Sequence, residues 1–162
     1  MQTEDVKILK DIYKGSEMGI FAFEGIARKS VNAQFVGSID KAKDQLEVFR
    51  NKVKYELMRH GEEPKGISGI QKFSAGTSIA FSTMFDKSAE NISEMIIKGN
   101  EMGEDKLSGE LDHTTGVSQE TRHLCLEFIE LQKKQKEEFS KYLQLPALSE
   151  FDLLLPSLGN RF

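Results

Sequence analysis

Apolar residues along this chain recur mostly at three- and four-residue steps, which is the spacing of one face of an α-helix. No segment shows the alternation of apolar and polar positions that is typical of a half-buried β-strand. Four long helices are therefore predicted, over residues 4–29, 32–60, 88–112 and 118–143. Gly61 and Pro64 favour the end of the second helix, because glycine suits a helix C-terminus and proline cannot continue a helix.

The segments outside these helices are apolar as well. Residues 61–86 are rich in Gly and Ser but also contain several Ile and Phe residues, so we predict a packed crossover with a short helix. The tail over residues 145–162 contains three consecutive leucines and is expected to pack on the bundle or on a protein partner. The sequence thus predicts an all-α four-helix bundle over residues 1–144, made of two helical hairpins joined by a long, partly helical crossover.

Two similar hexapeptides, KGSEMG at 14–19 and KGNEMG at 98–103, lie on the first and third predicted helices. Each contains two glycines four residues apart, and small residues at that spacing let a neighbouring backbone approach. A glycine inside a helix costs about 1 kcal/mol relative to alanine, so a compensating contact is expected. We interpret the repeat as a packing role shared by the two helices, with chance similarity as the alternative.

Composition narrows the classes of partner. The net charge is −4, and the sequence offers no basic face of the kind that nucleic-acid binding requires. No stretch approaches the roughly 18 apolar residues of a membrane span, and the first residues do not form an apolar signal core. We therefore expect a cytoplasmic protein with no nucleic-acid or membrane partner. The single cysteine, Cys125, lies in an apolar helical context and is interpreted as a small buried hydrophobic residue.

Three segments carry a resemblance to a known family: DIYKGSE at 11–17, YELMRHGEEP at 55–64 and IKGNEMGEDK at 97–106. With the order hairpin, crossover, hairpin, they resemble a bacterial ferritin-like family of unknown function, within the ferritin and rubrerythrin superfamily. The resemblance covers residues 5 to 143. Metal-binding members of the superfamily use a Glu from each of two helices and a Glu-x-x-His from each of the other two. The resemblance therefore implies iron or manganese as the candidate cofactor.

The chain matches this ligand pattern poorly. The second helix offers Glu47-Val-Phe-Arg50, with arginine where the pattern has histidine, and arginine is not a metal ligand at ordinary pH. The fourth helix contains one formal match, Glu120-Thr-Arg-His123, at the margin of its apolar face. Glu17 lies at the edge of the apolar arc of the first helix and is the candidate for a carboxylate site in the middle of the bundle.

A second candidate metal site depends on the path of the crossover. If the crossover runs the length of the bundle, the ends of the second and third helices meet the start of the fourth. The candidate ligands that would then gather at one end are Glu56, His60, Glu110, His113, Glu120 and His123. Such residues at helix ends are also commonly caps, dipole partners or solvated groups, and this alternative stays open together with that of no specific metal.

Two functions follow from this pattern. The residues favour an uncharacterised bundle that acts as a non-catalytic binding or scaffold module, and no catalytic residue can be assigned. The resemblance favours an iron- or manganese-binding protein with a role in oxidative stress or metal storage. A homo-oligomer, such as a dimer, is expected under both hypotheses, because helical hairpins often pair. The tail also has some similarity to the terminal peptides by which ferritin-like cargo proteins dock into a protein shell.

Overall fold

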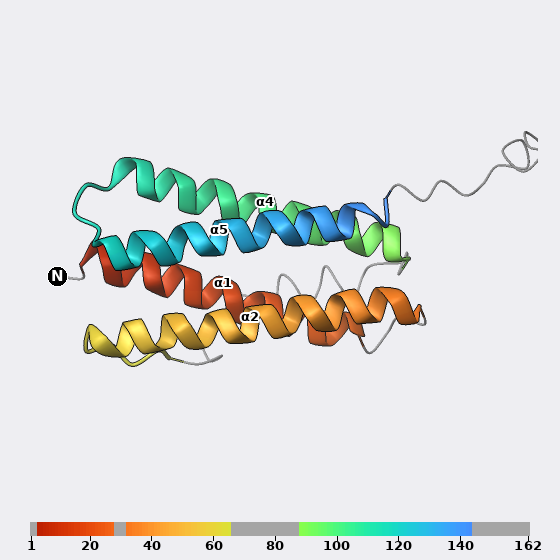
Figure 1. Cartoon of the computed structure of the whole chain (residues 1–162), viewed down its shortest axis with the longest axis horizontal. Helices are drawn as coiled ribbons and strands as arrows, with labels where there is room; N and C mark the ends of the chain where they lie inside the picture. The colour runs from red at the N-terminus through yellow and green to blue at the C-terminus, as the bar shows by residue number, and fades with distance from the viewer. Residues whose placement is uncertain (1–2, 28–31, 66–87, 144–162) are drawn as a thin grey trace, which may run out of the picture.

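The computed structural model describes residues 3–27, 32–65 and 88–143, which form four helices and contain no strand (Figure 1). The helices are α1 (Glu4–Ala27), α2 (Ala33–Arg59), α4 (Ala89–His113) and α5 (Gln119–Ser140). The predicted all-helical class is thereby confirmed, and the predicted helix bounds agree to within about three residues. Most of the predicted crossover and the whole of the predicted tail lie outside the described residues.

Local chemistry explains where the helices begin and end. The Asn32 side chain accepts a hydrogen bond from the Phe35 amide at 3.0 Å, and the Ser118 hydroxyl accepts one from the Thr121 amide at 3.2 Å. Each oxygen satisfies an amide that has no partner within its helix. After α2, Gly61 adopts φ +74°, a conformation in which glycine avoids the strain of a side chain. The predicted role of Gly61 as a helix stop is confirmed.

The helices form two antiparallel hairpins, α1 with α2 and α4 with α5. Helix α5 also contacts α1 and α2, and α4 contacts α1, so the hairpins share one core. In Figure 1, α1 and α5 begin at the same end of the bundle at which α2 and α4 end. We call this end the polar end, defined by Asp5, His60 and Ser118. Helices α2 and α4 therefore run in the same direction.

The core is continuous through all four helices and ends in an aromatic cluster at the other end of the bundle. Phe35 makes edge-to-face contacts with Phe139 and Tyr142, and Phe23 stacks on Phe139. The Tyr142 hydroxyl lies 2.7 Å from the Ser38 hydroxyl, which gives its polar group a partner inside the core. Full burial of one such aromatic or aliphatic side chain contributes about 1.5–3 kcal/mol, so this cluster joins the two hairpins firmly.

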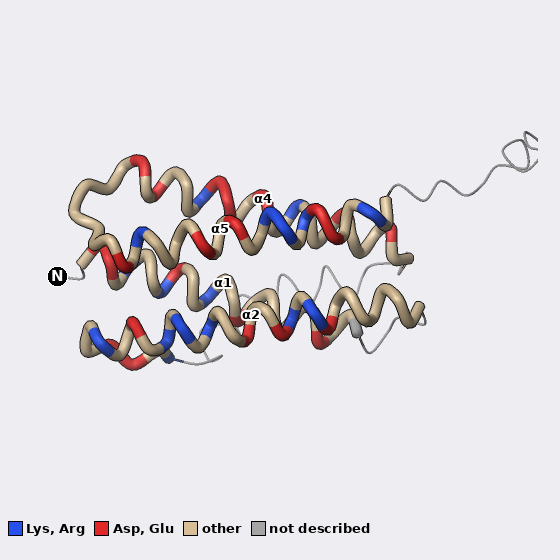
Figure 2. The backbone as a smooth tube through the Cα atoms, in the orientation of Figure 1, with Lys and Arg blue, Asp and Glu red and all other residues tan. Residues whose placement is uncertain are grey.

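The helix surfaces are highly charged. Figure 2 shows acidic and basic positions interspersed along all four helices. Within residues 3–27, 32–65 and 88–143, none of the helices combines the length and the apolar character that crossing a bilayer demands.

Candidate functional site

The middle of the first hairpin contains a buried ion pair. Glu17 of α1 is only 6% exposed, and its Oε1 lies 2.7 Å from Nη1 of Arg50 on α2. The Arg50 side chain is 28% exposed, so it crosses from the core to the surface. Tyr13 lies one turn before Glu17; burial raises the pKa of its phenol, and the negative charge of Glu17 raises it further. The guanidinium therefore supplies the positive charge that this buried carboxylate requires.

The second hairpin contains a comparable pair, in which the carboxylate is somewhat more exposed than Glu17. Nζ of Lys136 on α5 lies 2.9 Å from Oε1 of Glu104 on α4. The hydrogen bond to Glu104 raises the pKa of Lys136, and the charges of Glu101 and Asp105 act in the same direction against the effect of burial. An open groove of about 370 Å³ runs beside this pair between α4 and α5. Its lining mixes glutamates and lysines, so it has no dominant sign of charge.

The glycines of the repeated hexapeptide make different contacts. A Cβ added at Gly19 would lie 2.5 Å from Cδ1 of Leu46 on α2, and one added at Gly103 would collide with the amide of Gln132 on α5. A Cβ at Gly15 would meet the Phe128 ring at an ordinary 3.7 Å, and one at Gly99 would meet nothing within 4 Å. The predicted packing role thus holds for the second glycine of each copy. The expectation that a backbone would approach is wrong, because side chains occupy the space.

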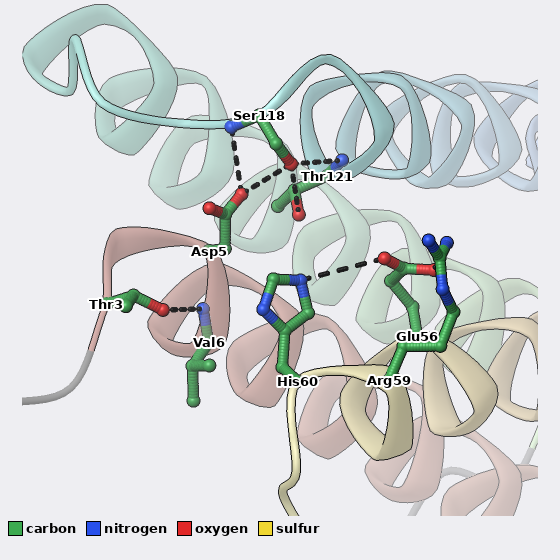
Figure 3. A network of polar contacts seen from close by, with 8 residues as sticks. All are labelled: Thr3, Asp5, Val6, Glu56, Arg59, His60, Ser118 and Thr121. Atoms are coloured by element: carbon green, nitrogen blue, oxygen red, sulfur yellow. Dashed lines mark hydrogen bonds and ion pairs between the residues drawn. The ribbon is translucent and has the colours of Figure 1, made fainter.

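At the polar end, hydrogen bonds join the start of α1 to the start of α5, and the polar residues at the end of α2 lie beside them (Figure 3). The amide of Ser118 donates to Oδ1 of Asp5 at 2.9 Å, and its hydroxyl donates to the same oxygen at 2.7 Å. Burial alone would raise the Asp5 pKa, but hydrogen bonds from Thr121 and Ser118 and the charge of His60 lower it below its ordinary value. The carboxylate therefore links the start of α1 to the start of α5.

Glu56 of α2 lies in the same region and is buried. Its carboxylate accepts from Nη1 of Arg59 at 2.9 Å and lies 3.6 Å from Nε2 of His60. Both partners belong to the same helix end. Figure 3 shows the His60 ring between Glu56 and the start of α1.

The remaining candidate metal ligands are dispersed around this end. Glu110 lies 3.4 Å from Lys7 through one oxygen, and its other oxygen is buried without a partner. His113 bonds the carbonyl of Gly109 in its own helix, and Glu120 is exposed. His123 points to solvent and lies 3.2 Å from Glu127.

The helix ends therefore converge as the traversing crossover would require, but the six candidate side chains do not gather into one cluster. Among the described residues, no three or more His, Cys, Asp or Glu side chains are grouped so that they could hold a metal ion. The metal site stays a prediction. Several of these side chains have other partners instead: Lys7 pairs with Glu110, Arg59 pairs with Glu56, and His113 bonds the Gly109 carbonyl.

Cys125 is fully buried on α5, as predicted. Burial, with the nearby negative charge of Glu110, raises the pKa of its thiol to about 11. A thiol with this pKa is almost entirely protonated at neutral pH and is a weak nucleophile.

Two polar contacts of the candidate site, an ion pair and a hydrogen-bonded helix start, were not predicted from the sequence. The pairing of Arg50 with Glu17 could have been inferred, because a buried carboxylate needs a cation and Arg50 is carried by the neighbouring helix. The Asp5 contact with Ser118 joins residues 113 positions apart and has no local signal. Comparisons of this chain with models of known protein families, with curated proteins and with solved structures find no significant match.

Proposed function

We propose that this protein is a ferritin-like helical bundle that acts as a non-catalytic binding or scaffold module. Two features of the fold support the ferritin-like part. The chain forms two antiparallel hairpins, and α2 and α4 run in the same direction (Figure 1). A single long crossover between two hairpins gives this relation of directions.

The observation that carries the scaffold role is the ion pair between Glu17 and Arg50. Glu17 has the burial and the mid-bundle position expected of a metal ligand, but its Oε1 lies 2.7 Å from a guanidinium. Arg50 occupies the histidine position of the Glu-x-x-His pattern on α2. Because arginine keeps its proton at all ordinary pH values, it supplies permanently the positive charge that a metal would bring.

The second hairpin supports the same interpretation. Lys136 of α5 lies 2.9 Å from Glu104 of α4, so a carboxylate on the first helix of each hairpin is neutralised by a cation on the second. Removing one partner of a buried pair leaves an uncompensated charge and is strongly destabilising. Both pairs therefore contribute to the stability of the bundle itself, which is the property that a rigid scaffold needs.

An iron- or manganese-binding role is the alternative, and one observation favours it. Oε2 of Glu110 is buried without a partner, at the end of the bundle to which Glu56 and His60 also belong. A cation held there would satisfy this oxygen. Carboxylates with one imidazole are ligands that suit iron and manganese.

Metal content tests the two functions against each other. The untagged protein is loaded anaerobically with Fe(II) or Mn(II), passed through a desalting column and measured by elemental analysis. We expect no retained metal. Retention of about one or two ions per chain, the stoichiometry of ferritin-like sites, would contradict the scaffold proposal. Its loss in Glu110→Gln and Glu56→Gln variants would then place the metal at the polar end, and its loss in Glu17→Gln would place it in the middle.

A further inference from the structure

Helix α2 exposes a row of large apolar side chains on the face opposite its core contacts. Val48, Tyr55 and Met58 are all exposed, and their spacings of seven and three residues place them on one side of a 3.6-residue helix. The opposite side of the same helix is buried against the bundle; its members include Phe35, Ile39, Leu46, Phe49, Val53 and Leu57. We call these three residues, together with the exposed Asp44 and Arg59, the outer face of α2.

We propose that the outer face of α2 binds the same face of a second copy of this chain, with the two α2 helices antiparallel. The two-fold axis would pass between Asn51 and Lys52, so that Val48 of each copy lies opposite Tyr55 of the other. A contact about a two-fold axis is self-complementary, because residue i meets residue j and j meets i. The proposal adds a partner and a surface to the scaffold role.

Charge complementarity selects this arrangement. Around an axis that places Val48 opposite Tyr55, Asp44 of one copy lies opposite Arg59 of the other. The two positions are equally distant from the axis, and both side chains are exposed on the outer face.

A parallel pairing of the same faces would have the reverse effect. It would place Asp44 of one chain opposite Asp44 of the other, and Arg59 opposite Arg59. Like charges at these positions would repel one another. The opposite charges of Asp44 and Arg59 therefore favour the antiparallel direction over the parallel one.

The contacts within one chain leave the centre of this face open. Lys52, next to the proposed axis, turns toward α5, and its Nζ lies 3.4 Å from Glu127 of that helix. The same Nζ lies 5.8 Å from the centre of the Phe49 ring of α2. Arg59 uses Nη1 for Glu56 but is largely exposed, and its fork of donors can serve a second carboxylate. Tyr55 offers the kind of rigid aromatic surface that dominates binding energy at protein interfaces.

The first test compares two substitutions of matched exposure. Tyr55 is 67% exposed on the outer face of α2, and Met102 is 66% exposed on α4. Sedimentation velocity over a range of concentrations measures the dimer dissociation constant of each variant. Tyr55→Asp should raise it about 30-fold or more, as loss of a central interface residue does, while Met102→Asp should leave it unchanged. A monomeric wild type, or a dimer that Tyr55→Asp leaves intact, would overturn the proposal.

Charge exchange tests the antiparallel register. Asp44→Arg and Arg59→Asp should each weaken the dimer by about tenfold, because each places like charges opposite one another. The double variant should recover most of the affinity lost in the single variants, since it exchanges the two signs; the loss of the Arg59 contact with Glu56 accounts for the remainder. Failure of the double variant to recover would contradict the register. Loss of the dimer only on removing residues 144–162 would place the contact in the tail and overturn the proposal.

Disulfide trapping gives an independent measurement. The double variant Val48→Cys with Tyr55→Cys should form a covalent dimer under mild oxidation, and Val48→Cys alone should not. The native Cys125 is fully buried with a raised pKa, so it will not compete. Covalent dimer from Val48→Cys alone would indicate a different register and overturn the arrangement. These outcomes do not depend on metal content, so failure of the dimer and failure of the metal-free scaffold role are distinguishable.

Discussion

In the first hairpin, Gly19 of α1 receives the Leu46 side chain of α2, whereas in the second hairpin Gly103 of α4 receives the amide of Gln132 of α5. The same hexapeptide thus creates two equivalent spaces, and the facing helix fills one with an apolar group and the other with a polar one. One turn beyond each of these residues stands a cation, Arg50 in the first hairpin and Lys136 in the second.

The hairpins differ in how well their buried polar atoms are hydrogen-bonded. Near Gly19, Glu17 and Arg50 bond each other. Around Gly103, Oε1 of Gln132 and Nδ2 of Asn100 are buried without partners. A buried polar atom without a partner costs about 1–3 kcal/mol, so the second hairpin should contribute less to the stability of the bundle than the first.

Removing the cation of each hairpin should have the largest effect and should separate the two. Arg50→Ala is expected to lower the free energy of unfolding by about 3 kcal/mol, because it leaves Glu17 charged in the core. Lys136→Ala should cost about 1 kcal/mol, since Glu104 is nearer to solvent. Urea unfolding followed by circular dichroism measures both. Glu17→Gln added to Arg50→Ala should recover part of the loss, and equal losses in the two hairpins would contradict the comparison.

Alanine substitutions at the glycines test the repeat. Gly99→Ala should raise the free energy of unfolding by about 1 kcal/mol through helix propensity, because a Cβ there meets nothing. Gly19→Ala gains the same propensity but overpacks against Leu46, and should lower it by about 1 kcal/mol. Gly103→Ala should fall between them, because the end of the Gln132 side chain can move. Thermal denaturation of the three variants in parallel decides the order, and a stabilising Gly19→Ala would contradict the packing role.

The contact that joins the hairpins at the polar end should depend on pH. Asp5→Asn is expected to lower the free energy of unfolding by about 1 kcal/mol at neutral pH, since Ser118 loses a charged acceptor. The folded-state pKa of Asp5 lies below its ordinary value, so its contribution is present above about pH 4 and is lost as the pH falls further. Unfolding of wild type and Asp5→Asn at pH 7 and at pH 3 should therefore show a difference that shrinks in acid. A difference that grows in acid would contradict this role.

The smallest change should make the second hairpin resemble the first. Gln132→Met keeps the length of the side chain and removes the buried oxygen without a partner. We expect a gain of about 0.5 kcal/mol in the free energy of unfolding, because an unsatisfied polar group is replaced by an apolar one. Leu46→Gln, the reverse exchange in the first hairpin, is the matched control and should destabilise. A loss of stability in Gln132→Met would show that the amide makes a contact that matters.

The helices could be predicted from the sequence because their signals are local. The three- and four-residue spacing of Leu46, Phe49 and Val53, and the stop at Gly61, depend only on neighbours along the chain. The same spacing places Glu56, Gln132 and Gln135 on the inner sides of their helices, and all three are buried.

The candidate site could be predicted only in part, because its contacts join residues far apart in sequence. Helical spacing put Glu17 at the edge of the core, yet its partner Arg50 was regarded only as a missing histidine. His60 and His123 were expected to share a cluster, but each lies beside a glutamate of its own helix. Side-chain length and competition from nearby lysines and arginines decide such pairings, and neither has a periodic signal.

The most direct test of the account is the urea unfolding midpoint of the wild type in EDTA compared with that in excess Fe(II) or Mn(II) under anaerobic conditions. A ligand that binds only the folded state stabilises it in proportion to the logarithm of its concentration over its dissociation constant. If Arg50 and Lys136 permanently supply the charge that a metal would bring, the two midpoints should coincide. A midpoint that rises with metal concentration, and no longer rises in the Glu17→Gln variant, would contradict the account.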